Sequence, residues 1–337
     1  MKNLLFTMIV LLCAAPCLSA DGVDGIRPAP DSVTLLKGSF RMSGAAFKYS
    51  SSLDSTAREA VQALASRLSL VCGKTSPVSS PVGLDGAAAS GAVKGMIFLI
   101  DNDMPEEAYS LDIQPGTAVV RAGGTAGILH SVQTLRQMLP DAIYEPRPVQ
   151  QRVRWILPCC TLEDCPDNAV RAVRIDVAAA YSDVAQLESF LDNMASVKLN
   201  VLRLMVADDD CWRPQTEAFP LLAQMTAYRG EKTYSRPELE RLVRHARLLG
   251  ISIVPEIGIP SKMLAELSLD SLPQELPAEL EDIFGTAPLV FGDGPDGSIE
   301  EFVSGSTASE LEGCASRLGV HKDSKDHSIW KTSMTLQ

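Results

Sequence analysis

The sequence predicts an α+β domain followed by an incomplete parallel β/α (TIM-type) barrel of about four βα units. Two observations lead to this fold class. Residues 21–150 mix short strands with two helical segments, whereas strands and helices alternate from about Arg171 onward, a pattern typical of parallel βα units. A closed eight-stranded barrel needs about 250 residues, and only residues 151–337 follow the first domain. The barrel is therefore expected to be cut short.

The first 20 residues have the features of a secretory signal peptide. A positive charge at Lys2 precedes a short apolar run, Leu4–Ala15, and small residues end the segment at Ala20. The run is too short to span a bilayer, and no later run is long and apolar enough to be a membrane span. We expect residues 1–20 to be removed and the product to be exported to the periplasm or the extracellular space.

Residues 21–150 carry the signals of a small mixed domain. Apolar periodicity predicts two helices, and alternation around a Pro-Gly turn predicts a hairpin. The expected elements are helices at Ser55–Leu70 and Thr125–Leu139, a strand at Gly95–Asp101, and hairpin strands at Tyr109–Ile113 and Ala118–Arg121. The Pro- and Gln-rich stretch Tyr144–Arg152 predicts a linker.

Residues 151–318 are expected to form the partial barrel. The predicted strands are Val173–Ala178, Leu199–Val206, Ile251–Ile257 and Pro288–Phe291, and the predicted helices are Val184–Val197 and Arg236–Leu249. The last of these helices follows Ser235 and has a proline in its first turn, which favours a helix start. Residues 319–337 are polar and without periodicity, so a disordered tail is expected.

Composition excludes several classes of function. The formal net charge is −12 and no basic stripe is present, which argues against nucleic-acid binding. Cys159, Cys160 and Cys165 fall in a Pro-flanked stretch interpreted as a loop, and the sequence leaves their pairing open. No histidine lies near them, so no metal site is predicted. No nucleotide or cofactor fingerprint occurs, and no cofactor is expected.

The segment Lys198–Arg213 is the strongest candidate for a functional site. Its apolar run ends at Asp208, Asp209 and Asp210, and Trp212 follows. Side chains at the carboxyl ends of parallel strands form the sites of β/α domains. Carboxylates bind hydroxyl groups and an indole can cover a ring face, so the segment suggests a sugar subsite. Two alternatives stay open, namely a solvated loop that caps the next helix and a tryptophan that belongs to the core.

Short motifs in a fixed order resemble the exo-β-N-acetylhexosaminidases of glycoside hydrolase family 20, and they cover about residues 26–295. In the first domain they are Ile26–Val33, Gly38–Phe40, Tyr109–Ile113 and Gln133–Leu139, and in the second region Ile175–Val177, Lys198–Asn200, Asp208-Asp209, Trp212-Arg213 and Val254–Ile257. The resemblance implies a family accessory domain at 21–150. It also implies terminal N-acetylglucosamine or N-acetylgalactosamine of glycans as the substrate class.

The family's reaction is a retaining hydrolysis assisted by the substrate's own acetamide group. By resemblance, Arg171 takes the place of the arginine that clamps sugar hydroxyls, with Asp208, Asp209 and Trp212 as further substrate-binding residues. Asp293 takes the place of the aspartate that orients the acetamide. Arg171 could instead pair with a neighbouring carboxylate, and Asp293 in its Gly-rich setting could instead form a turn.

The sequence departs from the family at the positions that carry the chemistry. Arg203 and Met205 stand where the family has histidines, Gly258 and Lys262 replace an aspartate and a histidine, and Gly294 stands in place of the general acid. Glycine holds no proton, and losing a general acid lowers the rate by about 10²–10⁴-fold. Glu256 could be a substitute acid, but its place after Pro255 favours a structural role.

We therefore expect a secreted member of the β-N-acetylhexosaminidase family with little or no hydrolytic activity of its own. Two alternatives remain: a non-catalytic remnant that binds glycans, and a truncated gene product without a stable function. The sequence does not predict the oligomeric state.

Overall fold

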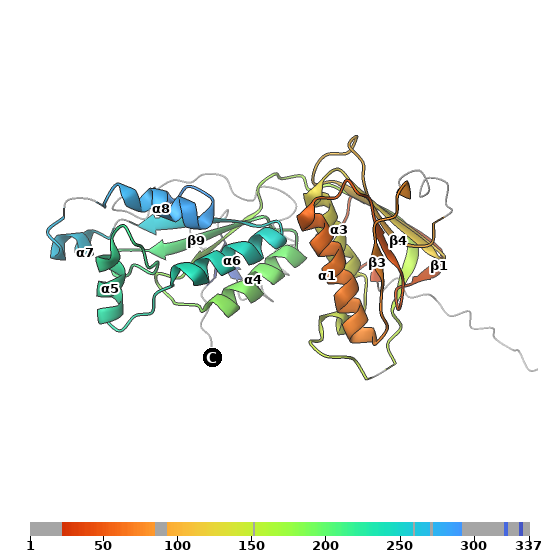
Figure 1. Cartoon of the computed structure of the whole chain (residues 1–337), viewed down its shortest axis with the longest axis horizontal. Coiled ribbons are helices and arrows are strands. Elements are labelled where there is room, and N and C mark those ends of the chain that lie inside the picture. Colours follow the sequence, from red (N-terminus) through yellow and green to blue (C-terminus); the bar gives the residue numbers. More distant parts are fainter. Residues whose placement is uncertain are drawn as a thin grey trace, which may run out of the picture.

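The computed structural model of the chain describes residues 22–84, 93–150, 152–258, 260–269, 272–291, 320–322 and 330–332. They form two bodies, each a sheet with helices packed on it, that lie side by side (Figure 1). We call residues 22–165 the first body, and residues 169–291 together with residues 320–322 and 330–332 the second body. None of the described helices is long and apolar enough to cross a membrane.

The first body is built on a seven-stranded mixed sheet with the order β1-β7-β5-β6-β4-β2-β3. Its strands are β1 (Ser32–Arg41), β2 (Phe47–Tyr49), β3 (Val78–Ser79), β4 (Gly95–Ile100), β5 (Tyr109–Gln114), β6 (Thr117–Ala122) and β7 (Ile156–Asp164). Helices α1 (Ser55–Cys72) and α3 (Thr125–Gln137) cover one face, and the 3₁₀ helix η2 (Asp141–Tyr144) follows α3. The predicted hairpin is present as antiparallel β5 and β6.

The second body is built on a sheet with the order β11-β10-β9-β8-β13-β12. Its strands are β8 (Ala172–Asp176), β9 (Val201–Ala207), β10 (Ser252–Gly258), β11 (Leu289–Phe291), β12 (Val320–Lys322) and β13 (Trp330–Thr332), and β8 to β11 run parallel. Its helices are α4 (Val184–Ser196), α5 (Pro220–Tyr228), α6 (Arg236–Leu248), α7 (Ser261–Glu266) and α8 (Glu275–Phe284). The strand–helix alternation expected from the sequence is present in β8 to β11.

Local signals in the sequence place the helix ends. Asp54 Oδ1 accepts a hydrogen bond of 2.8 Å from the Ala57 N–H at the start of α1, which ends at Gly73 in the left-handed region with φ 65°. At the start of α6, Ser235 and Glu238 form a capping box. These caps satisfy backbone groups that a helix end leaves unpaired.

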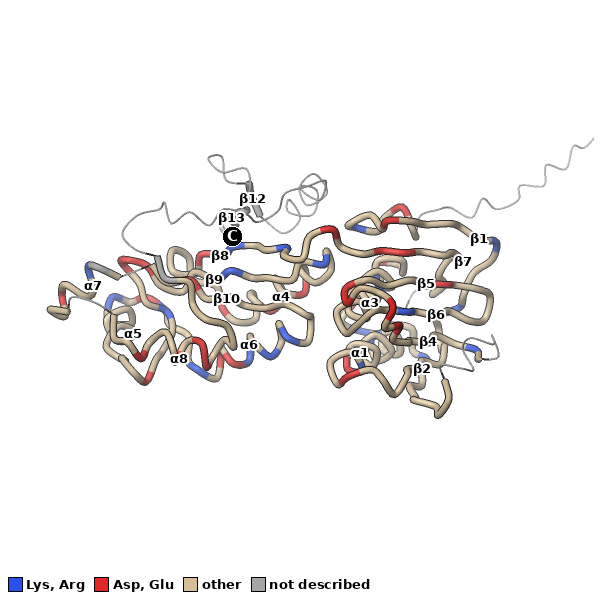
Figure 2. Tube along the Cα trace, turned by 90° about the horizontal axis from the view of Figure 1, so that it is seen from above, with Lys and Arg blue, Asp and Glu red and all other residues tan. Residues whose placement is uncertain are grey.

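The two faces of the second sheet differ in character. Leu202, Leu204 and Val206 of β9 belong to the core that this sheet shares with α4, α6 and α8, and Figure 2 shows these helices on one side of the strands. Arg203 alternates with these residues and so points to the opposite face. There it meets Glu256 of β10. The second face therefore carries buried charges rather than an apolar layer.

The boundary between the bodies differs from the predicted one at residue 150. Ile156–Asp164 forms β7, which pairs antiparallel with both β1 and β5 of the first sheet. The predicted loop around Cys159 and Cys160 is therefore a strand inside the first sheet. Both thiols are buried and free, so the structure forms no disulfide between them.

The expected disordered tail also differs where the structure describes it. Strands β12 and β13 pair with each other, and β13 lies parallel to β8 with Lys331 opposite Arg174. The sequence does not predict these two strands, because three residues are too few for an alternation of polar and apolar side chains to be recognised.

Helices α1 and α3 lie between the first sheet and the second body, where α3 contacts α4 and α1 contacts α6 (Figure 1). A set of charged and polar residues, which we call the joint, connects the two bodies beside these helices. It consists of Glu107 and Asp164 of the first body and Arg171, Lys198 and Asn200 of the second. All three second-body residues precede β8 or β9, so the joint lies at the amino ends of these strands.

Candidate functional site

The carboxyl ends of β8 to β11 meet at one edge of the second sheet, because these strands are parallel. Strand β9 ends at Ala207, and the chain then turns back so that Ala207 and Trp212 form an antiparallel bridge. Strand β10 ends beside this turn. A Cβ on Gly258 would lie 3.4 Å from the Asp208 Cα. Gly258 thus allows the two strand ends to approach closely.

The three aspartates after β9 have three different roles. Asp208 folds the turn, since its Oδ1 accepts hydrogen bonds from the N–H groups of Asp210 at 3.0 Å and Cys211 at 2.8 Å. Burial raises the pKa of Asp208, although these two hydrogen bonds act in the opposite direction. Asp210 is exposed and forms an ion pair of 2.9 Å with Lys262.

Asp209 is the aspartate that remains for a ligand. Its Oδ1 is buried and has no hydrogen-bond partner within the described part of the chain. A buried carboxylate oxygen without a donor is unfavourable by about 1–3 kcal/mol or more. Such an atom marks a place where a hydroxyl or N–H of a bound molecule would complete the hydrogen bonding.

Trp212 does not provide a platform for a sugar ring. Its side chain is fully buried and belongs to the core of the second body. The backbone N–H of Trp212 donates to Thr226 Oγ1 at 2.9 Å, which fixes the turn against α5. The interpretation as a ring-face residue is therefore wrong, and the alternative of a core tryptophan is the one that the structure shows.

Arg171 lies at the opposite end of the sheet from Asp208 and Asp209. It precedes β8, is only 6% exposed, and forms an ion pair of 2.8 Å with Glu107 of the first body. Its Nε donates to the Lys198 carbonyl oxygen at 2.7 Å. The structure thus uses the Arg171 guanidinium in the joint, as the alternative of a paired arginine expects, and does not bring it to the carboxyl edge.

Arg213 builds the carboxyl edge, a role that the sequence interpretation missed. Its guanidinium donates to the carbonyl oxygens of Val177 and Ala178, both at 2.8 Å, and to that of Lys232 at 2.7 Å. It also forms an ion pair of 2.9 Å with Glu231. The Arg213 side chain therefore ties the segment after β8 to the segment after α5. Its place directly after a buried tryptophan is the signal that could have identified it.

Glu256 lies on the charged face of the sheet, between two guanidinium groups. It is fully buried, and its carboxylate accepts from Arg174 Nε at 2.5 Å and from Arg203 Nε. Figure 2 shows basic residues within β8 and β9, the strands that hold these two arginines. Both carboxylate oxygens of Glu256 are thus engaged by guanidinium groups of the neighbouring strands, which suits a structural role and not that of a general acid.

The remaining predictions for the site concern Asp293, Gly294 and metal ligands. Asp293 and Gly294 are outside the described residues, directly after the end of β11 at Phe291. Among the described residues, no group of three or more His, Cys, Asp and Glu side chains could hold a metal ion.

Two sequence models of one family match the chain. "Glycosyl hydrolase family 20, domain 2" matches residues 24–165, and "Glycosyl hydrolase family 20, catalytic domain" matches residues 169–279. The two matches divide where the first body ends after β7. The first body thus matches the family's second domain, and residues 169–279 of the second body match its catalytic domain.

Relatives and solved structures agree with this division. The β-hexosaminidase of Akkermansia muciniphila is 29% identical over 179 residues, which cover 50% of this chain and 35% of that protein. The family-20 β-N-acetylhexosaminidase of Streptomyces coelicolor superposes with a TM-score of 0.62 at 27% identity and covers 88% of this chain and 58% of its own. A variant β-hexosaminidase of Streptomyces plicatus, solved with the product N-acetylglucosamine, has the same TM-score and identity, with 57% of its own chain covered.

The chain therefore spans about a third of the Akkermansia protein and somewhat over half of each Streptomyces structure. The order of its motifs, both domain matches and both structural likenesses point to one assignment. The chain belongs to glycosyl hydrolase family 20.

Proposed function

We propose that the chain is an exported protein of the β-N-acetylhexosaminidase type that binds terminal N-acetylhexosamines of glycans and hydrolyses them slowly or not at all. The single observation that supports binding is the buried, unpaired Oδ1 of Asp209 at the carboxyl edge. In the Streptomyces plicatus relative the bound molecule is N-acetylglucosamine, so we infer that an N-acetylated sugar is the ligand that pairs with Asp209.

The charged side chains near Asp209 support weak or absent hydrolysis. Lys262 forms an ion pair with Asp210, and Arg203 pairs with Glu256, so these four side chains neutralise one another. By resemblance, Gly294 stands where the family has its general acid, and glycine has no side chain that could supply a proton. A site with these groups can hold a sugar but lacks a donor for the leaving oxygen.

We further infer that the parallel strands β8 to β11 form the first part of a β/α barrel. The match of residues 169–279 to the family's catalytic domain supports this inference. For export, we propose that residues 1–20 are a cleaved signal peptide. Amino-terminal sequencing of the secreted protein should give Asp21 as the first residue, and a product that keeps Met1 would contradict it.

The central experiment measures binding and turnover on the same pure protein. Titration calorimetry with N-acetylglucosamine should give saturable binding, and a chromogenic N-acetyl-β-glucosaminide should give turnover at least about 10²-fold below that of an intact family enzyme. Asp209→Ala should abolish the binding. Asp210→Ala is the matched control, because Asp210 is exposed and its loss should leave binding unchanged.

Each proposal has its own contrary result. Rapid hydrolysis by the wild-type chain would disprove the lack of activity. Absence of binding in a protein that melts cooperatively would disprove the sugar site. A non-cooperative melt would instead favour a truncated product without a stable function, the third possibility that the sequence leaves open.

A further inference from the structure

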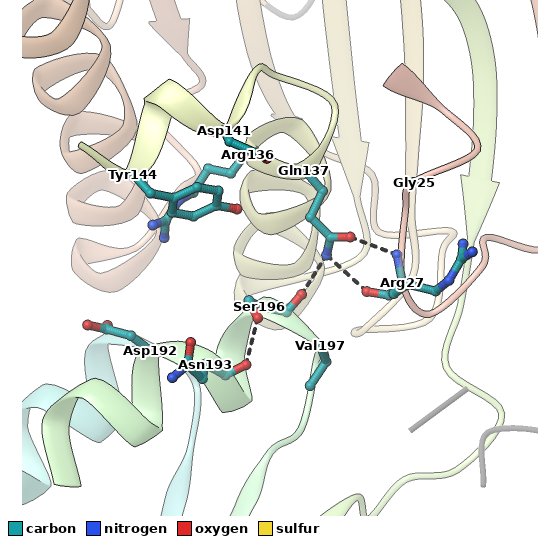
Figure 3. Close-up of a pocket in the computed structure, with 10 residues that line it drawn as sticks. All are labelled: Gly25, Arg27, Arg136, Gln137, Asp141, Tyr144, Asp192, Asn193, Ser196 and Val197. Carbon is teal, nitrogen blue, oxygen red and sulfur yellow. Dashed lines mark hydrogen bonds between the residues drawn. The ribbon is translucent and has the colours of Figure 1, made fainter. Parts of the chain in front are cut away.

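A cavity of about 370 Å³ lies in the seam between the two bodies (Figure 3). Its walls come from α3, η2 and the last turn of α4, together with the segment around Arg27. Helix α4 leads into the amino end of β9, whereas Asp209 follows the carboxyl end of the same strand. The cavity is therefore a separate place from the carboxyl edge.

Gln137 fixes the walls of this cavity. Its Oε1 accepts from the Arg27 N–H at 2.7 Å, and its Nε2 donates to the carbonyl oxygens of Arg27 at 2.9 Å and Ser196 at 2.6 Å. One amide thus holds the amino-terminal segment, α3 and α4 together. These three hydrogen bonds fix the positions of the cavity walls relative to one another, which lowers the entropy that binding must overcome.

Tyr144 offers an aromatic surface at this cavity. The side chain is 43% exposed, and the Arg136 guanidinium lies 4.9 Å from the ring centroid. Figure 3 shows the ring reaching from η2 into the space above Asp192 and Asn193. The guanidinium lies over one face of the ring, and the exposed part of the side chain lines the cavity, where it can meet the C–H face of a bound ring.

Arg136 also contributes an unsatisfied donor. Its Nε is buried and has no hydrogen-bond partner in the described ranges. A buried donor of this kind is unfavourable unless a further group accepts a hydrogen bond from it. The Asp141 carboxylate and the Asn193 amide also line the cavity, so donors and acceptors lie around one aromatic ring.

The charges of the lining residues select the class of ligand. The lining contains two carboxylates, Asp141 and Asp192, and two guanidinium groups, Arg27 and Arg136. The formal charges of the lining residues therefore sum to zero. An anion would meet two carboxylates and a cation would meet two guanidinium groups. A neutral molecule with many hydroxyl groups and one apolar face meets neither obstacle, and the volume lies within the range of about 300–1,000 Å³ that ligand pockets have.

We propose that this cavity binds a neutral saccharide. One pyranose ring stacks on the free face of Tyr144, and its hydroxyls pair with Arg136 Nε, Asp141 and Asn193. The site is independent of the proposed carboxyl-edge function, since it shares no residue with it. The protein would then hold a glycan at two places, one near the amino ends and one at the carboxyl ends of the strands of the second sheet.

The test is a titration of the ¹⁵N-labelled full chain, followed by heteronuclear NMR, with glucose, N-acetylglucosamine, N,N′-diacetylchitobiose and inorganic phosphate, each used alone. At least one sugar should shift the signals of Tyr144, Asn193 and Ser196 in a saturable way, whereas phosphate should not. Tyr144→Ala should raise the Kd at these signals about tenfold, the equivalent of about 1.4 kcal/mol of stacking. Tyr144→Phe should keep the affinity within about threefold, because it keeps the ring.

Two controls separate this site from others. Tyr228→Ala removes a tyrosine that is 93% exposed at the end of α5, and it should leave the Kd unchanged. Asp209→Ala should remove binding at the carboxyl edge and leave the Tyr144 signals unaffected. The proposal is wrong if no sugar shifts these signals, if phosphate does so instead, or if Tyr144→Ala and Asn193→Ala both bind like the wild type.

Discussion

Lys198 Nζ donates a hydrogen bond of 2.5 Å to Asp164 Oδ2, and this pair connects the end of β7 in the first body to the start of β9 in the second. Both side chains are less than a tenth exposed. Tyr109 joins them, since its hydroxyl donates to Asp164 Oδ2 at 2.8 Å. Burial lowers the pKa of Lys198, although Asp164 acts in the opposite direction.

The first prediction concerns this buried pair. Asp164→Asn should lower the free energy of unfolding by about 3–5 kcal/mol, because it leaves the Lys198 charge uncompensated in the interior. Asp164→Asn combined with Lys198→Met should lower it by less than the sum of the single effects, as measured by urea denaturation. Lys262→Met is the control: it removes the exposed ion pair with Asp210 and should change the free energy of unfolding by about 0–1 kcal/mol. If the effects of Asp164→Asn and Lys198→Met on the free energy of unfolding are strictly additive, the two side chains are not coupled.

The second prediction concerns acid stability at His130. Burial, assisted by the Arg171 charge, lowers the pKa of His130 from 6.5 to about 4. Between these values the unfolded chain binds a proton that the folded chain does not. The free energy of unfolding therefore falls as the pH drops through this window, by at most about 3 kcal/mol. His130→Gln should flatten that part of the pH profile, relative to the wild type, in denaturant titrations at pH 4 to 7.

His245 is the matched control for this profile. A hydrogen bond with Asp192 raises the pKa of His245, so its stabilisation is present below pH 6.5 and is lost as the pH rises through the raised value. His245→Gln should therefore change the profile with the opposite sign. If the two variants have the same effect, the assignment of the acid sensitivity to His130 is incorrect.

The third prediction separates a structural from a catalytic role for Glu256. Glu256→Gln removes the carboxylate that lies between Arg174 and Arg203, and it should lower the free energy of unfolding by about 3–5 kcal/mol. Any residual hydrolysis, measured per folded molecule well below the melting temperature, should be unchanged within about threefold. A folded Glu256→Gln protein of normal stability whose hydrolysis is abolished would instead identify Glu256 as an acid.

The fourth prediction concerns Trp212 as a core residue. Trp212→Ala should lower the free energy of unfolding by about 3–5 kcal/mol, and Trp212→Phe should have a smaller effect because it fills more of the space. The affinity of the folded Trp212→Phe protein for N-acetylglucosamine should match that of the wild type. A stable Trp212→Phe protein with weakened sugar binding would instead show that the Trp212 indole contributes to binding.

The sequence predicts most strands and helices because their apolar periodicity is long enough to identify. Strand β7 was missed because Pro158 and the Cys159-Cys160 pair interrupt the alternation, and its pairing with β1 joins residues more than 100 positions apart. The burial of the Trp212 side chain likewise depends on core residues of distant segments, such as Leu222 and Tyr234, that no local pattern contains. Only the complete chain fold brings these partners together.

The candidate site was predicted in part. Asp208 and Asp209 lie at the carboxyl edge, as their place after β9 predicts. The position of Arg171 was also readable, since a residue before an apolar run lies at the amino end of the strand that follows. The motif that resembles the family at Arg171 instead suggests a sugar-binding role, which the position at the amino end of β8 does not support. The role of Arg213 depends on carbonyl groups from two distant segments, which the sequence does not place.

The position of the joint has a consequence for how the protein can vary. Arg171, Lys198 and Asn200 attach the second body to the first through the amino ends of its strands. Gly250 continues this contact before β10, where a Cβ would lie 2.8 Å from Leu129. The described loops after β8, β9 and β10 lie at the other ends of these strands, away from the joint. Insertions, deletions and substitutions in those loops can therefore accumulate during evolution while the two bodies keep their mutual orientation.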